Sequence, residues 1–104
     1  MVIKNIKNNK NIGNISIFNY STNKIKKMNI VIANYSMTIN EININEVIRT
    51  NFQISTDSHY QIKIYFVNNK EINTNIGYIT PGLSIDDKIV IKNKVILLNP
   101  KITK

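Results

Sequence analysis

Apolar and polar residues alternate along most of this chain. In YQIKIYFV, residues 60–67, every second position is apolar or aromatic: Tyr60, Ile62, Ile64 and Phe66. The same period of two recurs in NISIFNY (14–20), in KKMNIVIANY (26–35) and in DKIVIKNKVILL (87–98). Alternation of β-branched and aromatic residues is typical of strands, and Ile suits a pleated sheet better than a helix. The pattern predicts a chain built from short strands.

Residues that favour turns separate these stretches. Asn68-Asn69 lies between two alternating runs and predicts a tight hairpin, because Asn tolerates a positive φ. Pro81-Gly82 is typical of a type II turn. Turn signals recur about every 8–14 residues, which predicts an all-β domain of about seven or eight strands. We expect a small antiparallel β-sandwich, immunoglobulin-like or jelly-roll-like, with a small open barrel as the alternative.

One stretch, TINEININEVIRTNFQI at residues 38–54, fits two descriptions. Its apolar residues partly follow one face of a helix, but three Asn residues weaken any helix there. We interpret it as strand, loop and strand. The alternative is a single helical turn near residues 46–49.

A further pattern concerns residues 13–32, GNISIFNYSTNKIKKMNIVI. This stretch resembles the first hairpin of many bacterial immunoglobulin-like domains. The resemblance implies a sandwich in which these two strands pair, and it implies no activity. A chain of 104 residues is long enough for one domain with a core. We expect a single sandwich over residues 1–104, with residues 1–12 as an edge strand or a packed N-terminal extension.

Composition changes the interpretation of the net charge of +8. The chain has 19 Asn, 23 Ile and 13 Lys, all residues with AT-rich codons, and Arg49 is its one Arg. Proteins that grip phosphate or bases usually carry several Arg, because the guanidinium fork matches those groups. We therefore give the net charge little weight as a sign of nucleic-acid binding. It still attracts polyanions in a salt-dependent way.

Candidate catalytic and metal-binding residues are few. The chain has no Cys and one His, in the string Thr56-Asp57-Ser58-His59. Neighbours in an extended chain point to alternate sides, so this string does not form a triad by itself, and we interpret it as a polar turn. Asp86-Asp87 is the one close acidic pair, interpreted as a solvated turn. With three Gly, a phosphate-binding loop is not expected. We expect no enzyme, no cofactor and no metal.

The second face of the strands carries apolar residues where a solvated sheet should be polar. They are Val31, Ala33, Val67, Ile79 and Val90. Strands covered on both faces suggest a partner or a second copy of the chain. Our first hypothesis is therefore a non-enzymatic assembly or interaction subunit of a viral, phage or filament type, acting through sheet edges and faces. The candidate interface residues are Val2, Ile3, Ile6, Val31, Ala33 and Val67.

Two alternatives stay open. Aromatic residues interleaved with cations on a sheet can stack single-stranded bases. The candidates for such a nucleic-acid site are Lys24, Lys26, Lys27, Lys63 and Tyr65. Against this, the aromatic residues Tyr60, Phe66, Phe18 and Tyr78 have an ordinary use in filling a core. The other alternative is a small inhibitor or immunity-type protein.

The start of the chain has no continuous apolar run of the kind found in a secretory signal, and no run is long enough to span a bilayer. We therefore expect a cytoplasmic protein or a component of a viral or surface assembly. The sequence indicates no small-molecule substrate.

Overall fold

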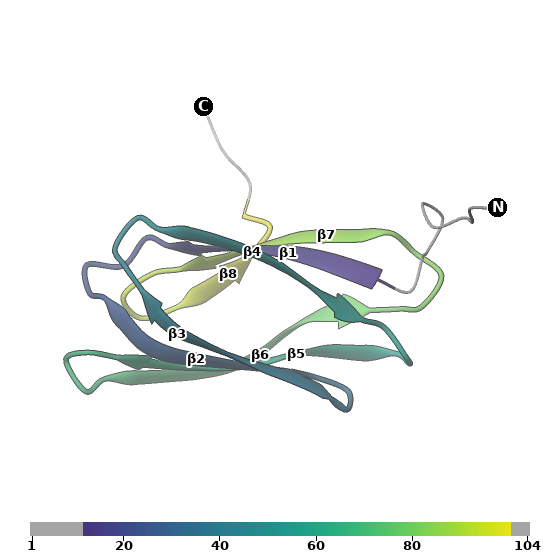
Figure 1. The fold of residues 1–104 in the computed structure, drawn as a ribbon, viewed down its shortest axis with the longest axis horizontal. Helices are drawn as coiled ribbons and strands as arrows, with labels where there is room; N and C mark the ends of the chain where they lie inside the picture. The colour runs from purple at the N-terminus through teal and green to yellow at the C-terminus, as the bar shows by residue number, and fades with distance from the viewer. Residues whose placement is uncertain (1–11, 101–104) are drawn as a thin grey trace, which may run out of the picture.

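A computed structural model describes residues 12–100, which form eight strands and no helix. The strands are β1 (Ile12–Asn19), β2 (Ile25–Ile32), β3 (Tyr35–Ile42), β4 (Val47–Gln53), β5 (Ser58–Phe66), β6 (Glu71–Ile79), β7 (Ile85–Ile91) and β8 (Ile96–Leu98). They make two layers packed face to face (Figure 1). Sheet A has the order β4-β1-β7-β8 and sheet B the order β3-β2-β5-β6. The predicted all-β sandwich is confirmed. The predicted N-terminal extension lies outside the described residues, apart from Ile12.

The pairing of β1 differs from the sequence-based expectation. β1 pairs with β4 in antiparallel and with β7 in parallel orientation, so both of its edges are occupied within sheet A. β2 lies in sheet B, where it pairs with β3 and β5. The hairpin implied for residues 13–32 is therefore wrong. The connection between these strands crosses from one sheet to the other, and local alternation carries no information about that choice.

The interior follows the predicted alternation. The side chains of β5 that the pattern assigned to one face, Tyr60, Ile62, Ile64 and Phe66, are all buried. Ile15 and Ile17 of β1 meet them from the other sheet. The rest of the buried apolar core consists of Ile25, Met28, Ile30, Ile32, Ile42, Phe52, Ile54, Ile79, Ile89, Ile91 and Ile96. Burial of so much Ile supplies the hydrophobic free energy that holds the two layers together.

The predicted turns are present. β5 and β6 are joined at Asn68-Asn69, where Asn69 has a φ of 70°. Gly82 has a φ of 90° in the turn after Pro81, as a type II turn requires at that position. Residues 38–54 form strand, loop and strand, and the alternative of a helical turn is wrong, because β4 begins at Val47.

Two β-bulges change the phase of the alternation. Between β5 and β6 the register shifts so that Tyr60 pairs with Ile76 but Ser58 pairs with Ile79. Gly77, with a φ of 82°, lies in the bulge. The shift turns Ile79 into the core and leaves Tyr78 72% exposed. The expectations that Ile79 faces outward and that Tyr78 fills the core are wrong, because one extra residue inverts the faces that follow it.

The two sheets are also joined by a polar contact. The Tyr60 hydroxyl on β5 donates a hydrogen bond to Asp87 Oδ2 on β7 at 2.6 Å. Asn99 Nδ2 donates to Asp87 Oδ1 at 2.9 Å. Asp86-Asp87 therefore lies within a strand, and its interpretation as a solvated turn is wrong. Asp87 is half-buried because it faces the Tyr60 hydroxyl across the sandwich.

The buried Tyr60 hydroxyl should make the free energy of unfolding depend on pH in the alkaline range. Burial, the hydrogen bond to Asp87 and the negative charge of Asp87 raise the Tyr60 pKa well above its usual value. In the unfolded chain a Tyr ionises near pH 10, so above that pH the folded state holds a proton that the unfolded state has lost. Tyr60 therefore makes its full contribution to the free energy of unfolding below about pH 10. Above that pH the contribution falls by up to about 1.4 kcal/mol per pH unit.

The measurement is urea unfolding of the wild type and of Tyr60→Phe between neutral pH and pH 11. Tyr60→Phe leaves the Asp87 carboxylate without this donor, so we expect it to be less stable by about 1–3 kcal/mol at neutral pH. The difference between the two proteins should shrink above pH 10, since the variant has no proton to lose. If the two proteins differed in free energy of unfolding by the same amount at every pH, Tyr60 would not be the source of the alkaline pH dependence.

Candidate functional site

The outer face of sheet B presents three rows of side chains across its four strands. In the order β3-β2-β5-β6, the first row is Asn40, Lys27, Tyr65 and Glu71. The second row is Thr38, Asn29, Lys63 and Asn73, and the third is Ser36, Val31, Gln61 and Asn75. This face is polar and rich in side-chain amides, as expected for a sheet whose other face is the core.

Three of the predicted nucleic-acid residues meet on this face. Lys27 Nζ lies 5.1 Å from the centroid of the Tyr65 ring, and Lys63 Nζ lies 5.7 Å from it. Both distances are within the range of a cation–π contact. Lys27 stands directly opposite Tyr65 on the neighbouring strand, and Lys63 is two residues before it on the same strand. We call these three residues the lysine–tyrosine cluster.

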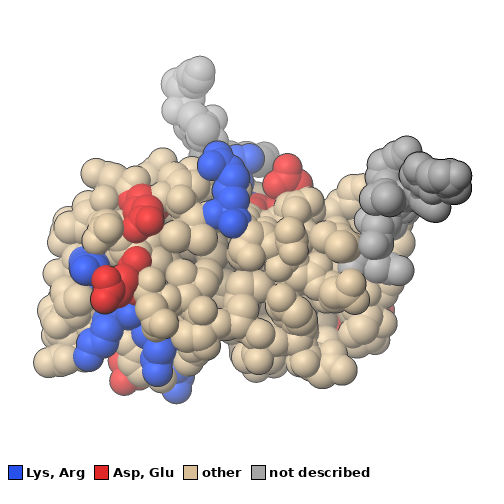
Figure 2. All heavy atoms as spheres, in the orientation of Figure 1, with Lys and Arg blue, Asp and Glu red and all other residues tan. Residues whose placement is uncertain are grey.

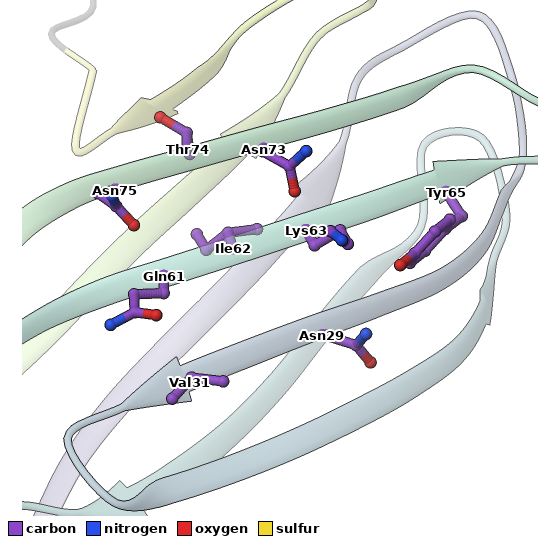
Figure 3. A pocket seen from close by; sticks show the side chains of 9 residues that line it. All are labelled: Asn29, Val31, Gln61, Ile62, Lys63, Tyr65, Asn73, Thr74 and Asn75. Carbon is purple, nitrogen blue, oxygen red and sulfur yellow. The ribbon is translucent and has the colours of Figure 1, made fainter.

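A groove runs beside this cluster. It has a volume of about 400 Å³, and its lining residues include Asn29, Gln61, Asn73 and Asn75 together with Lys63 and Tyr65. Figure 3 shows the lining side chains spread over β2, β5 and β6. The amide of Asn29 accepts a hydrogen bond from Thr38 Oγ1 at 3.0 Å. The groove therefore offers several amide donors and acceptors next to two ammonium groups and one aromatic ring.

The other two predicted nucleic-acid residues lie at the edge of this region. Lys24 Nζ is 3.5 Å from Glu41 Oε1, so an acid partly offsets its charge. Lys26 is the extra residue of the bulge between β2 and β5, and it is exposed beside Lys27.

The charged side chains are unevenly distributed over the surface. Figure 2 shows basic and acidic side chains gathered at the left end of the molecule, where Figure 1 places the β5–β6 turn. Nine cations and six acids lie within residues 12–100, and the other five Lys lie outside them.

The predicted interface residues do not come together. Val31 lies in the third row of sheet B, and Ala33 lies in the following turn with a φ of 54°. Val67 is 49% exposed, and it lies beyond the other end of β5. Val31 and Val67 are thus at opposite ends of sheet B. Val2, Ile3 and Ile6 are outside the described residues.

An apolar surface lies instead on the outer face of sheet A. Val47, Phe18, Val90 and Leu97 stand side by side across β4, β1, β7 and β8. We call these four residues the apolar row. Tyr20, two residues after Phe18 along the chain, lies next to the row, with its ring centroid 5.6 Å from that of Phe18. Tyr20 is 49% and Leu97 38% exposed, while Val90 is buried.

The apolar row borders a hollow of about 490 Å³, and Lys88 and Lys92 are among its lining residues. Sequence reasoning missed this surface. The expectation that Phe18 fills the core is wrong, because Phe18 lies on the face of β1 opposite Ile15 and Ile17. Its neighbours on that face come from strands far apart in the sequence. The one local signal was the pair of aromatic residues on the face opposite Ile15 and Ile17.

The string Thr56–His59 shows a structural role. The Ser58 hydroxyl accepts a hydrogen bond from the backbone N–H of Ala33 at 2.8 Å, which ties the start of β5 to the β2–β3 turn. Within residues 12–100, no three His, Asp or Glu side chains come close enough to hold a metal ion. In the same part of the chain no helix is long and apolar enough to cross a membrane.

Comparison with known proteins bears on the fold. No protein-family model matches the chain, and no curated protein matches it. Among solved structures, the NMR structure of a protein from Eubacterium rectale is similar, with a TM-score of 0.63 and 12% sequence identity. The similarity covers 86% of this chain and 87% of that one. At this identity the likeness shows that the sandwich arrangement is shared between the two chains, and it carries no function.

Proposed function

We propose that the protein is a non-enzymatic assembly subunit that associates with a second copy of itself through the outer face of sheet A. The observation that carries this proposal is the apolar row, which crosses all four strands of that sheet. A contiguous apolar surface on a folded domain usually marks an interaction site. Joining two copies there removes Leu97 and Tyr20 from water.

The distribution of charge supports the same face. The lysine–tyrosine cluster lies on sheet B, so two copies that meet through sheet A keep these cations far apart. Lys88 and Lys92 remain close to the contact, and they repel their counterparts in the other copy. Salt screens this repulsion, because the Debye length falls from about 30 Å at 0.01 M to about 3 Å at 1 M. Association should therefore tighten as salt is added.

The test is the solution mass of the 12.0 kDa chain by light scattering on a sizing column, repeated over a range of salt concentrations. We expect a discrete oligomer whose dissociation constant falls with salt. Tyr20→Ser and Leu97→Ser should each weaken association about ten-fold, since each removes roughly 1–2 kcal/mol of apolar burial.

The matched control is Tyr78→Ser, which removes a ring that is 72% exposed and lies away from the apolar row. It should leave the mass unchanged. A monomer at every salt concentration would overturn self-association. A dimer that Tyr20→Ser and Leu97→Ser leave intact would place the contact elsewhere.

A further inference from the structure

The lysine–tyrosine cluster lies on the sheet opposite to the apolar row and is not used by the proposed association. We infer that the outer face of sheet B binds a segment of single-stranded nucleic acid, with one base stacked on Tyr65 and the neighbouring phosphates held by Lys27 and Lys63. This inference goes beyond self-association and does not depend on it.

The first argument is the composition of the cluster. Lys27 Nζ and Lys63 Nζ lie 5.1 Å and 5.7 Å from the centroid of the same aromatic ring. Stacking of a base on an aromatic ring is stronger than an exposed cation–π contact, and the Tyr65 ring is half-buried, so part of it remains accessible. A base can therefore displace an ammonium group from Tyr65. The displaced Lys stays on the same sheet face, within reach of the phosphate attached to that base.

The second argument is the groove beside the ring. Asn29, Gln61, Asn73 and Asn75 line it and carry amides that both donate and accept hydrogen bonds (Figure 3). Such groups match the edges of unpaired bases, which are exposed in a single strand and occupied in a duplex. A sulfated polysaccharide would use the two Lys but would have no planar group to stack on Tyr65. The combination of ring, cations and amides favours a single-stranded nucleic acid.

The third argument concerns the path of the phosphate chain across sheet B. Glu71 stands opposite Tyr65 on β6, and its carboxylate repels phosphate on that side. Lys27 stands on the other side of Tyr65, on β2, and Lys63 precedes Tyr65 on β5. The phosphate chain therefore passes over β2 and β5 rather than over the β6 end of the first row. Glu71→Gln should tighten binding.

The experiment uses the full chain and fluorescein-labelled oligo(dT) and oligo(U) of about 15 nucleotides, a length suited to a small single-strand site. Binding is followed by fluorescence anisotropy at several salt concentrations. We expect a slope of log K against log salt of about −1.4 or steeper, since two neutralised phosphates contribute about −0.7 each. Lys63→Gln should reduce the slope by about 0.7.

Variants of Tyr65 separate stacking from charge. Tyr65→Ser should weaken binding about five-fold or more, and Tyr65→Phe should retain it, because stacking requires the ring and not the hydroxyl. Tyr78→Ser and Lys94→Gln, both exposed and away from the cluster, are the matched controls and should bind as the wild type does. Amide shifts in NMR spectra of the complex should map to β2, β5 and β6.

Several outcomes would overturn the inference. One is no binding at low salt. Another is equal affinity for duplex DNA or for heparin together with no effect of Tyr65→Ser, which would indicate attraction of any polyanion. A third is a set of amide shifts confined to sheet A. Loss of self-association in Tyr20→Ser leaves this test unaffected, so the two proposals fail independently.

Discussion

Replacing Asn19 with alanine is expected to lower the free energy of unfolding by about 3 kcal/mol, more than any other polar substitution in the described chain. Asn19 is 0% exposed. Its Nδ2 donates to the backbone oxygens of Asn23 at 3.1 Å, Ile42 at 3.1 Å and Asn43 at 3.2 Å. Its Oδ1 accepts hydrogen bonds from the backbone N–H and the hydroxyl of Ser21, at 3.1 Å and 2.6 Å.

The size of the effect follows from what these bonds connect. Asn19 ends β1 of sheet A, and Ile42 ends β3 of sheet B. The same side chain thus joins two connections that cross between the sheets. Alanine would remove the donor from the buried bond to the Ile42 carbonyl oxygen and from the part-buried bond to that of Asn43, and each unpaired buried group costs about 1–3 kcal/mol. The melting temperature should fall by about 12–24 °C, at roughly 4–8 °C per kcal/mol for a domain of this size.

The measurement is thermal and urea unfolding followed by circular dichroism. The matched control is Asn14→Ala, on the exposed face of the same strand, which should change stability by less than about 0.5 kcal/mol. Asn19→Asp keeps the size but loses both N–H donors, so it should destabilise at least as much as alanine. If Asn19→Ala and Asn14→Ala behaved alike, Asn19 would not be the anchor described.

Gly77→Ala should be the second large effect, with a loss of about 2–3 kcal/mol. Gly77 has a φ of 82°, a backbone conformation that costs an L-residue roughly 1–2 kcal/mol. A Cβ there would lie 2.8 Å from Leu98 Cδ2 and 3.1 Å from Tyr60 Cδ2. Tyr60 is fully buried and hydrogen-bonded to Asp87, so it has little freedom to move away.

Gly82→Ala is the control that separates backbone strain from crowding. Gly82 has a similar φ of 90°, but a Cβ there would meet no atom within 4 Å. Gly82→Ala should lower the free energy of unfolding by about 1 kcal/mol, which corresponds to the backbone strain alone. Urea unfolding of both variants gives the comparison. Equal losses at the two positions would show that the contacts with Leu98 and Tyr60 contribute nothing.

Much of the fold was predictable, because the alternation of side chains is a local property of a strand. Tyr60, Ile62 and Ile64 are buried because they share one face of β5, and that follows from their spacing alone. The Asn68-Asn69 and Pro81-Gly82 turns were predictable for a similar reason. Asn and Gly tolerate a positive φ wherever they stand in a fold.

The candidate surfaces were predictable only in part. Tyr65 and Lys63 come together because they are two residues apart on one strand, and the sequence shows this. That Lys27 joins them depends on the register between β2 and β5. The apolar row depends on four strands from distant parts of the sequence. Alternation indicated that Val90 faces outward, but not which residues of other strands lie beside it. The role of Asn19 was not predictable, because the sequence has 19 Asn residues and does not show which of their amides is buried.

By itself, the sequence determined the strands, most of their inward faces and the turns between neighbours, because these depend on side-chain spacing and on the backbone preferences of single residues. Only the tertiary structure decided that β1 and β2 belong to different sheets and that Gly77 turns Ile79 into the core. It also decided that Phe18 stands beside Val90 and that Tyr60 reaches Asp87. Strand order, register and bulges are set by the packing of the whole core, where the free energy of each pairing depends on all the others.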